Sequence, residues 1–318
     1  MTGKEKMIKA LKHEPITGHV PHFELVFYLT MEVLGKVHPS HRIFHQWGQM
    51  SAVEKELQLQ DQADCYIDIA EKYQHCAIFV HPSVENFDAV KRLLEIIRER
   101  SGDEYFIMLH GDSTYSIPDG EHMMDFSERL FEEPQSILDD QMRRTDKNLE
   151  LASKFRGSGL IDGYALCSDY CFNTSSFFTN ELFEELIVPP LRTLIAGYHE
   201  MGYYSIKHSD GNIMAILDQI VKCKPDALHS IDPQGGVDLA EVKEMVGDKV
   251  TLIGNVNCGL LQTGTEEQIK ADVMRSLRQG MPGGGFIFST SNCVYTGLAL
   301  KRYELMHELW REHGIYTG

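Results

Sequence analysis

The sequence lacks a long apolar segment and an excess of basic residues. No apolar run approaches the roughly 18 residues of a membrane span, and residues 1–15 are polar and amphipathic rather than a secretory leader. We therefore expect no membrane partner. Only 30 Lys and Arg stand against 47 Asp and Glu, which gives a formal net charge of −17. Because such a charge repels phosphate backbones, we also expect no nucleic-acid partner.

Paired cysteines and interdomain linkers are missing too. The seven cysteines are scattered and include no CxxC pair, which excludes a zinc knuckle and is typical of reduced thiols in a cytoplasmic protein. No Pro-, Gly- or Ser-rich linker and no low-complexity tract divides the 318 residues. We therefore expect one domain over residues 1–318.

Short β-rich runs alternate with longer helical patterns along nearly the whole chain. Eight alternations without a GxGxxG after the first run favour an α/β fold of the (β/α)8 TIM-barrel type over a doubly wound sheet. Residues 1–18 add an N-terminal helical extension, residues 60–73 fit either helix or strand, and Pro189 and Pro190 divide or kink a helix. The expected strands are residues 20–27, 76–81, 105–112, 160–169, 204–210, 227–232, 250–256 and 285–292.

Polar residues recur at the ends of these runs. Active sites of such barrels lie at the C-terminal ends of the strands, and a barrel interior is otherwise filled by Val, Ile and Leu. So many polar groups on one rim are costly unless they bind something, so we predict a polar active site there. The residues are His22, Glu24, His81, His110, Asp112, Asp169, His208, Asp210, Asp232, Asn255, Asn257, Asn292 and Cys293.

The sharpest local feature is His208-Ser209-Asp210-Gly211. Residues two apart on a strand point the same way, so His208 and Asp210 can share a metal or a proton. Cys293, just after the last run, could approach from across the rim and complete a three-ligand zinc site with one open position. The alternative is a buried histidine bonded to Asp210, with Cys293 as a packing residue. Asp232 could likewise orient a ligand or only satisfy its own turn.

Four blocks of the C-terminal half carry a resemblance to a known family. They are residues 208–212 (HSDGN), 231–233 (IDP), 252–256 (LIGNV) and 282–287 (PGGGFI), the last followed by Ser291-Asn292-Cys293. With them the chain resembles the uroporphyrinogen decarboxylase superfamily, and within it the cobalamin-dependent methyltransferase branch. The resemblance implies a single (β/α)8 barrel domain over residues 1–318.

The two branches of that superfamily differ in their sites. Decarboxylases carry arginines just after the first strand, whereas residues 22–29 here contain none. The methyltransferase branch binds zinc through a His-x-Cys pair and a later Cys, which implies zinc at His208, Asp210 and Cys293, with Asp210 in place of a cysteine. A carboxylate makes this a harder site, suited to an ether or alcohol oxygen. Without zinc, Glu24 or Asp169 could protonate the leaving oxygen.

The resemblance also implies a partner. A corrinoid-binding signature of the Asp-x-His-x-x-Gly type does not occur, so the corrinoid would be carried by a separate corrinoid-binding protein. We expect a methyltransferase that moves a methyl group between that protein and a small O-methyl or N-methyl compound, in either direction. The alternatives are a uroporphyrinogen decarboxylase-like decarboxylase and a catalytically inactive binding barrel. The expected substrate contacts are His110, Asp232, Asn255 and Asn257.

Overall fold

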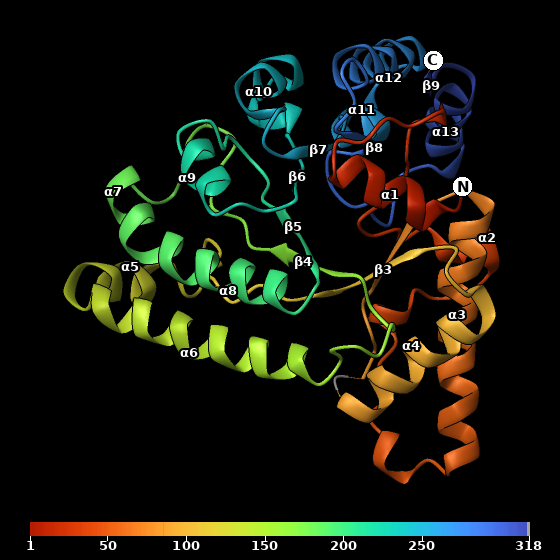
Figure 1. Cartoon of the computed structure of the whole chain (residues 1–318), viewed down its shortest axis with the longest axis horizontal. Coiled ribbons are helices and arrows are strands. Elements are labelled where there is room, and N and C mark those ends of the chain that lie inside the picture. Colours follow the sequence, from red (N-terminus) through yellow and green to blue (C-terminus); the bar gives the residue numbers. More distant parts are fainter. Residues whose placement is uncertain (85, 317–318) are drawn as a thin grey trace.

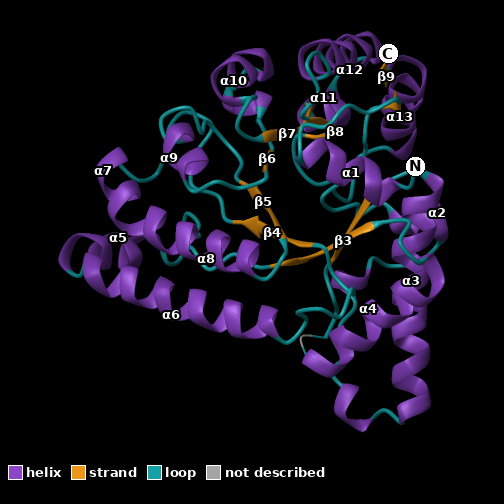
Figure 2. Cartoon of the chain, in the orientation of Figure 1, coloured by secondary structure: helices purple, strands orange, loops and turns teal. Residues whose placement is uncertain are grey.

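A parallel sheet surrounded by helices forms the body of the protein (Figure 1 and Figure 2). The computed structural model describes residues 1–84 and 86–316. Seven strands lie in the order β2-β3-β4-β5-β6-β7-β8, so every neighbour in the sheet is also the next strand in the chain. Seven of the eight predicted runs are confirmed as strands: β2 (Ala77–Val80), β3 (Phe106–His110), β4 (Gly163–Cys167), β5 (Tyr204–His208), β6 (Ala227–His229), β7 (Thr251–Val256) and β8 (Phe286–Thr290).

The first predicted run behaves differently. Residues 20–27 are described but form no regular strand, and His22 makes only an isolated parallel bridge to Phe288. The carbonyl of Pro21 accepts the Phe288 N–H at 2.8 Å, and the carbonyl of His22 accepts the Cys76 N–H at 2.7 Å. This segment therefore connects the β8 edge of the sheet to the β2 edge. Pro21 has no N–H to offer to a ladder, which is one reason why the pairing stays irregular.

The helices follow most of the predicted patterns. The ambiguous residues 60–73 belong largely to α3, which begins after a capping box formed by Ser51 and Glu54. Pro189 and Pro190 lie in the first turn of α8, directly after a π-helical turn over Phe183–Ile187. The helices are α1 (Gly3–Leu11), α2 (Thr30–Leu34), α3 (Ala52–Lys72), α4 (Phe87–Ser101), α5 (Met123–Glu132), α6 (Pro134–Ser153), α7 (Asn180–Leu182), α8 (Val188–Glu200), α9 (Leu217–Lys222), α10 (Leu239–Val246), α11 (Cys258–Thr263), α12 (Glu266–Gly280) and α13 (Leu300–His313).

Apolar side chains fill the N-terminal end of the barrel-like sheet. Met7, Ala10 and Leu11 of α1 belong to one buried cluster with alternate residues of the strands, and the Thr251 hydroxyl donates to the Ala10 carbonyl at 2.7 Å. The predicted N-terminal helix therefore packs against the strand starts. The short strands β1 (Gly18–His19) and β9 (Ile315–Tyr316) pair antiparallel, so the segment that follows α1 lies beside the C-terminal strand. Polar groups are left to the opposite end of the sheet.

No helix within the described ranges has both the length and the apolar character that a bilayer span requires.

Gly211 should be the less replaceable of two glycines with left-handed backbones. A Cβ at Gly211 (φ +79°) would collide with the carbonyl oxygens of Cys171 and Phe172, the latter at 2.7 Å, whereas a Cβ at Gly236 (φ +73°) meets nothing within 4 Å. We expect Gly236→Ala to cost about 1 kcal/mol through backbone strain alone and Gly211→Ala about 3 kcal/mol, because backbone must also move. Urea unfolding of both variants measures this, and equal costs would contradict it.

Candidate active site

Three potential metal ligands meet where β4 and β5 end. His208 is the last residue of β5, Asp210 follows two residues later, and Asp169 lies two residues beyond β4. One ligand atom from each lies within 4.8 Å of the others. His208 Nε2 is 3.6 Å from Asp169 Oδ1 and 3.7 Å from Asp210 Oδ1. The structure thus places the predicted pair His208 and Asp210 together and adds Asp169 to them.

Asp210 is the most constrained member of this cluster. Its Oδ2 accepts a hydrogen bond from the Asn292 amide, and its backbone N–H donates to Asp169 Oδ1 at 2.9 Å. Its Oδ1 is buried and has no hydrogen-bond partner among the described residues. Burial, together with the neighbouring Asp169, raises the pKa of Asp210 to about 8. A buried carboxylate oxygen without a partner is unfavourable unless a proton or a cation neutralises it.

His208 approaches a second histidine on its other side. Its Nδ1 lies 2.7 Å from Nδ1 of His229, and both imidazoles are buried. Burial lowers the pKa of His208, so the ring is neutral at neutral pH. Sequence spacing did not predict this contact, although both histidines end neighbouring strands.

Cys293 lies beside the cluster rather than in it. Its neighbour Asn292 contacts Asp210, but the Cys293 sulfur is not among the ligand atoms that lie within 4.8 Å of one another. The side chain is half-buried, and burial with the Asp210 charge raises the pKa of the thiol to about 11. The Cys293 thiol must therefore lose its proton before its sulfur can bind a cation.

Glu24 is anchored at the end of β8. Thr290 Oγ1 lies 2.5 Å from both Glu24 Oε2 and the Asn292 carbonyl. The hydroxyls of Ser289 and Thr290 and the Thr290 backbone N–H all donate to Glu24 Oε2. These hydrogen bonds favour the ionised carboxylate, but burial outweighs them and raises the pKa of Glu24 to about 7. The hydrogen-bond partners of Glu24 are Ser289 and Thr290, not the three-residue cluster, so direct protonation of a substrate by Glu24 stays a prediction.

The four predicted substrate contacts have different surroundings. Asp232 accepts hydrogen bonds from the backbone N–H groups of Gly211 and Gln234. Asn257 is the N-cap residue of α11. Asn255 is buried and bonded to the Ile231 carbonyl and Arg275. His110 is exposed, with Nε2 3.4 Å from the Cys167 carbonyl. Substrate contact by all four stays a prediction, and only His110 has an exposed side chain.

A buried ion pair under the cluster was not expected from the sequence. Lys207 Nζ lies 2.8 Å from Asp112 Oδ2, and these side chains are 0% and 1% exposed. The same ammonium donates to the carbonyls of Leu166 and Ser168 at 3.1 and 3.0 Å. The sequence signal that could have indicated it was a lysine inside a predicted strand, directly before His208. It joins the ends of β3, β4 and β5, from which the cluster extends.

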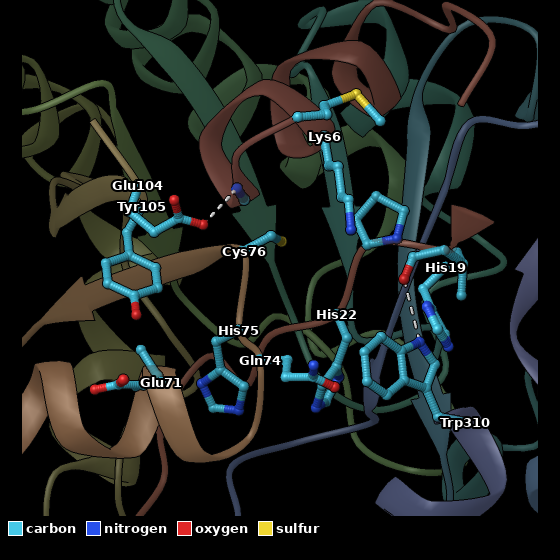
Figure 3. A pocket seen from close by; sticks show the side chains of 15 residues that line it. Lys6, His19, His22, Glu71, Gln74, His75, Cys76, Glu104, Tyr105 and Trp310 are labelled. Carbon is cyan, nitrogen blue, oxygen red and sulfur yellow. Dashed lines mark hydrogen bonds between the residues drawn. The ribbon is translucent and has the colours of Figure 1, made fainter. Parts of the chain in front are cut away.

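A cavity of about 380 Å³ lies at the opposite end of the sheet (Figure 3). It is lined by α1 and by residues that precede β2 and β3, including Lys6, His75, Cys76 and Glu104. It shares no residue with the cluster of Asp169, His208 and Asp210, so it does not belong to this site.

Comparison with known proteins supports the resemblance found in the sequence. Residues 160–313 match the sequence model of the family described as uroporphyrinogen decarboxylase (URO-D). No curated protein is a significant match. A methyltransferase from Methanosarcina mazei has a TM-score of 0.74 at 16% identity, covering 98% of this chain and 99% of that chain. A GH5_18 from Streptomyces cattleya in complex with GlcNAc has a TM-score of 0.52 at 12% identity, covering 95% and 82%. At these identities the structures show a shared fold.

Glu24 should make stability depend on pH. Its pKa rises from 4.5 to about 7 on folding, so between these values the folded state binds the extra proton and stability falls as pH rises. The difference in unfolding free energy between wild type and Glu24→Gln should therefore shift against wild type by about 3 kcal/mol from pH 4.5 to pH 8. Urea unfolding across this range measures it, with Glu150→Gln on exposed α6 as control. A constant difference would show that folding does not raise the pKa of Glu24.

Lys207 should be required for stability. Lys207→Met leaves the Asp112 carboxylate buried without its cation, which should cost about 3–5 kcal/mol. The matched control is Lys154→Met, which removes an exposed ion pair with Glu150 and should change stability by about 0.5 kcal/mol or less. Thermal and urea unfolding would reveal the contrast, and a Lys207 variant as stable as the control would contradict it.

Proposed function

We propose a function on the premise that residues 160–313 belong to the uroporphyrinogen decarboxylase family. The protein is a methyltransferase that moves a methyl group between a small O-methyl or N-methyl compound and a corrinoid carried by a partner protein. Support comes from the Methanosarcina mazei structure, which is named a methyltransferase and matches this chain over nearly its full length. The observation that carries the proposal is Asp210 Oδ1, which has no hydrogen-bond partner among the described residues and lies 3.7 Å from His208 Nε2.

The donor atoms of this cluster fit zinc. An imidazole nitrogen and carboxylate oxygens are ordinary zinc ligands, and the buried Asp210 Oδ1 lacks any partner among residues 1–84 and 86–316. We assign His208 and Asp210 as ligands and Cys293, beside Asn292, as the third. Asp169 is then free for proton exchange. Its side chain is 48% exposed, so a substrate can reach it at the mouth of the site, the open side of the barrel-like sheet where the strands end.

Each residue has a separate task in this proposal. Zinc bound there would supply Lewis-acid polarisation of the oxygen or nitrogen that carries the methyl group. Asp169 gives a proton to that atom as the methyl group leaves, or removes one in the reverse direction. His110, exposed at the end of β3, contacts the substrate from the neighbouring side of the mouth. Asn292 holds Asp210 in place through its amide.

A decarboxylase is the second candidate, because the matching family carries that description. A porphyrinogen with many carboxylates needs cations around it. Residues 22–29 contain no arginine, and the half-exposed residue at the end of β4 is the acidic Asp169 rather than a cation. Formation of a coproporphyrinogen from uroporphyrinogen by the purified protein would establish this candidate and reject the methyltransferase.

The zinc content of the purified full chain tests the proposal. We expect about one zinc per chain by plasma mass spectrometry, lost in His208→Ala, Asp210→Asn and Cys293→Ala. Asp169→Asn and His110→Ala should keep zinc yet lower methyl transfer from methoxy compounds to reduced cobalamin by about 10²-fold or more. Circular dichroism verifies the fold of each variant.

Three outcomes would overturn parts of this assignment. Loss of zinc from Asp169→Asn with retention in Cys293→Ala would make Asp169 the third ligand. Wild-type protein that binds no zinc when it is added would reject the metal site. A protein with neither zinc nor any turnover would be an inactive binding barrel.

A further inference from the structure

Two buried imidazoles lie side by side at the ends of β5 and β6. His208 and His229 are register partners in the sheet, and their ring centroids are 4.9 Å apart. Their Nδ1 atoms are separated by 2.7 Å, a distance that requires one proton between them. The position of that proton decides which nitrogen of His208 has a free lone pair.

The other nitrogen of His229 settles the position of this proton. His229 Nε2 lies 3.1 Å from the Thr290 carbonyl oxygen, which can only accept a hydrogen bond. His229 is completely buried, and its hydrogen-bond partners are this carbonyl and His208. A buried imidazole without a carboxylate partner is neutral and carries one proton, here on Nε2. Its Nδ1 therefore accepts, and Nδ1 of His208 donates.

This arrangement leaves Nε2 of His208 unprotonated. That atom faces Asp169 Oδ1 at 3.6 Å and Asp210 Oδ1 at 3.7 Å. If His229 were absent, a proton on Nε2 would be favoured, because it could then be shared with a carboxylate. A nitrogen with a lone pair binds a metal ion, whereas a protonated nitrogen does not.

The end of β8 supports both sides of this arrangement. The Thr290 backbone N–H donates to Glu24 Oε2 at 3.1 Å, which helps to hold the carbonyl that His229 contacts. Two residues later, the Asn292 amide donates to Asp210. The same strand end thus orients the partner of His208 and the carboxylate that faces it.

We infer that His229 is a positioning residue that selects the tautomer of His208 and thereby prepares Nε2 to bind a divalent metal ion. The inference rests on the proposed zinc site, but it concerns the protein's own proton arrangement. Partners of this kind typically change metal affinity 10- to 100-fold.

Zinc affinity is the first measurement. His229→Phe keeps a planar ring but removes the acceptor, and it should weaken zinc binding by about 10- to 100-fold in competition with a chromophoric chelator. The matched control is His307→Phe, because His307 is also buried and its Nε2 bonds to a carbonyl, that of Tyr73, at 2.9 Å. The control should change the zinc affinity by less than about threefold. Equal effects of both substitutions would overturn the inference.

The tautomer of His208 is the second measurement, and it needs no metal. Nitrogen-15 NMR of the zinc-free full chain, with the His208 signals assigned by their loss in His208→Ala, should show a proton on Nδ1 and none on Nε2. His229→Phe should reverse this, and His307→Phe should not. A proton on Nε2 of wild-type His208 overturns the inference even if zinc binds. If wild type shows the expected tautomer but binds no zinc, the proposed site fails and the role of His229 stands. The wild-type result needs only the assignment from His208→Ala, so a His229→Phe variant that does not fold leaves the test intact.

Discussion

The buried ion pair of Lys207 and Asp112 is the constraint on which the rest of the site depends. One ammonium binds a carboxylate beyond the end of β3 and the carbonyls of Leu166 and Ser168 around the end of β4, while its own residue belongs to β5. A buried charge without these partners would cost several kcal/mol, so the three strand ends are held in one arrangement. Asp169 follows Ser168 directly and His208 follows Lys207. The ion pair therefore sets where two members of the cluster leave the sheet.

The end of β8 is the second support, and it acts through hydrogen bonds rather than charge. Thr290 contacts Glu24 and His229, and Asn292 contacts Asp210. The cluster thus lies between the Lys207–Asp112 ion pair on one side and the hydrogen bonds at the end of β8 on the other. The apolar layers below exclude water from both, which strengthens each polar contact and raises the cost of leaving one unmade.

Seven strands and the N-terminal helix could be predicted, because parallel strands buried on both faces read as short apolar runs. The first predicted run, residues 20–27, is not a regular strand. Nothing in its sequence reveals that Pro21 and His22 join two sheet edges by isolated hydrogen bonds. The site was predictable as a set of strand-end residues. The contacts within it were not, because they depend on strand register and loop path: His208 contacts His229 only because their strands pair at that step. For the same reason, sequence spacing could not place Asp169 in the cluster.

The charges of the site bear on its chemistry more directly than its fold does, since one fold hosts many reactions. Two carboxylates and an imidazole lone pair converge in a largely buried place, in a chain whose formal net charge is −17. Bringing like charges together is unfavourable until a proton or a cation arrives, which is why the pKa of Asp210 is raised and why a cation that replaced the proton would gain two carboxyl groups as partners. The overall negative charge of the chain repels a polyanion, whereas a small neutral compound meets no such obstacle. The proposed methyl transfer is therefore easier to reconcile with the charge of this chain than the decarboxylation of a substrate with many carboxylates.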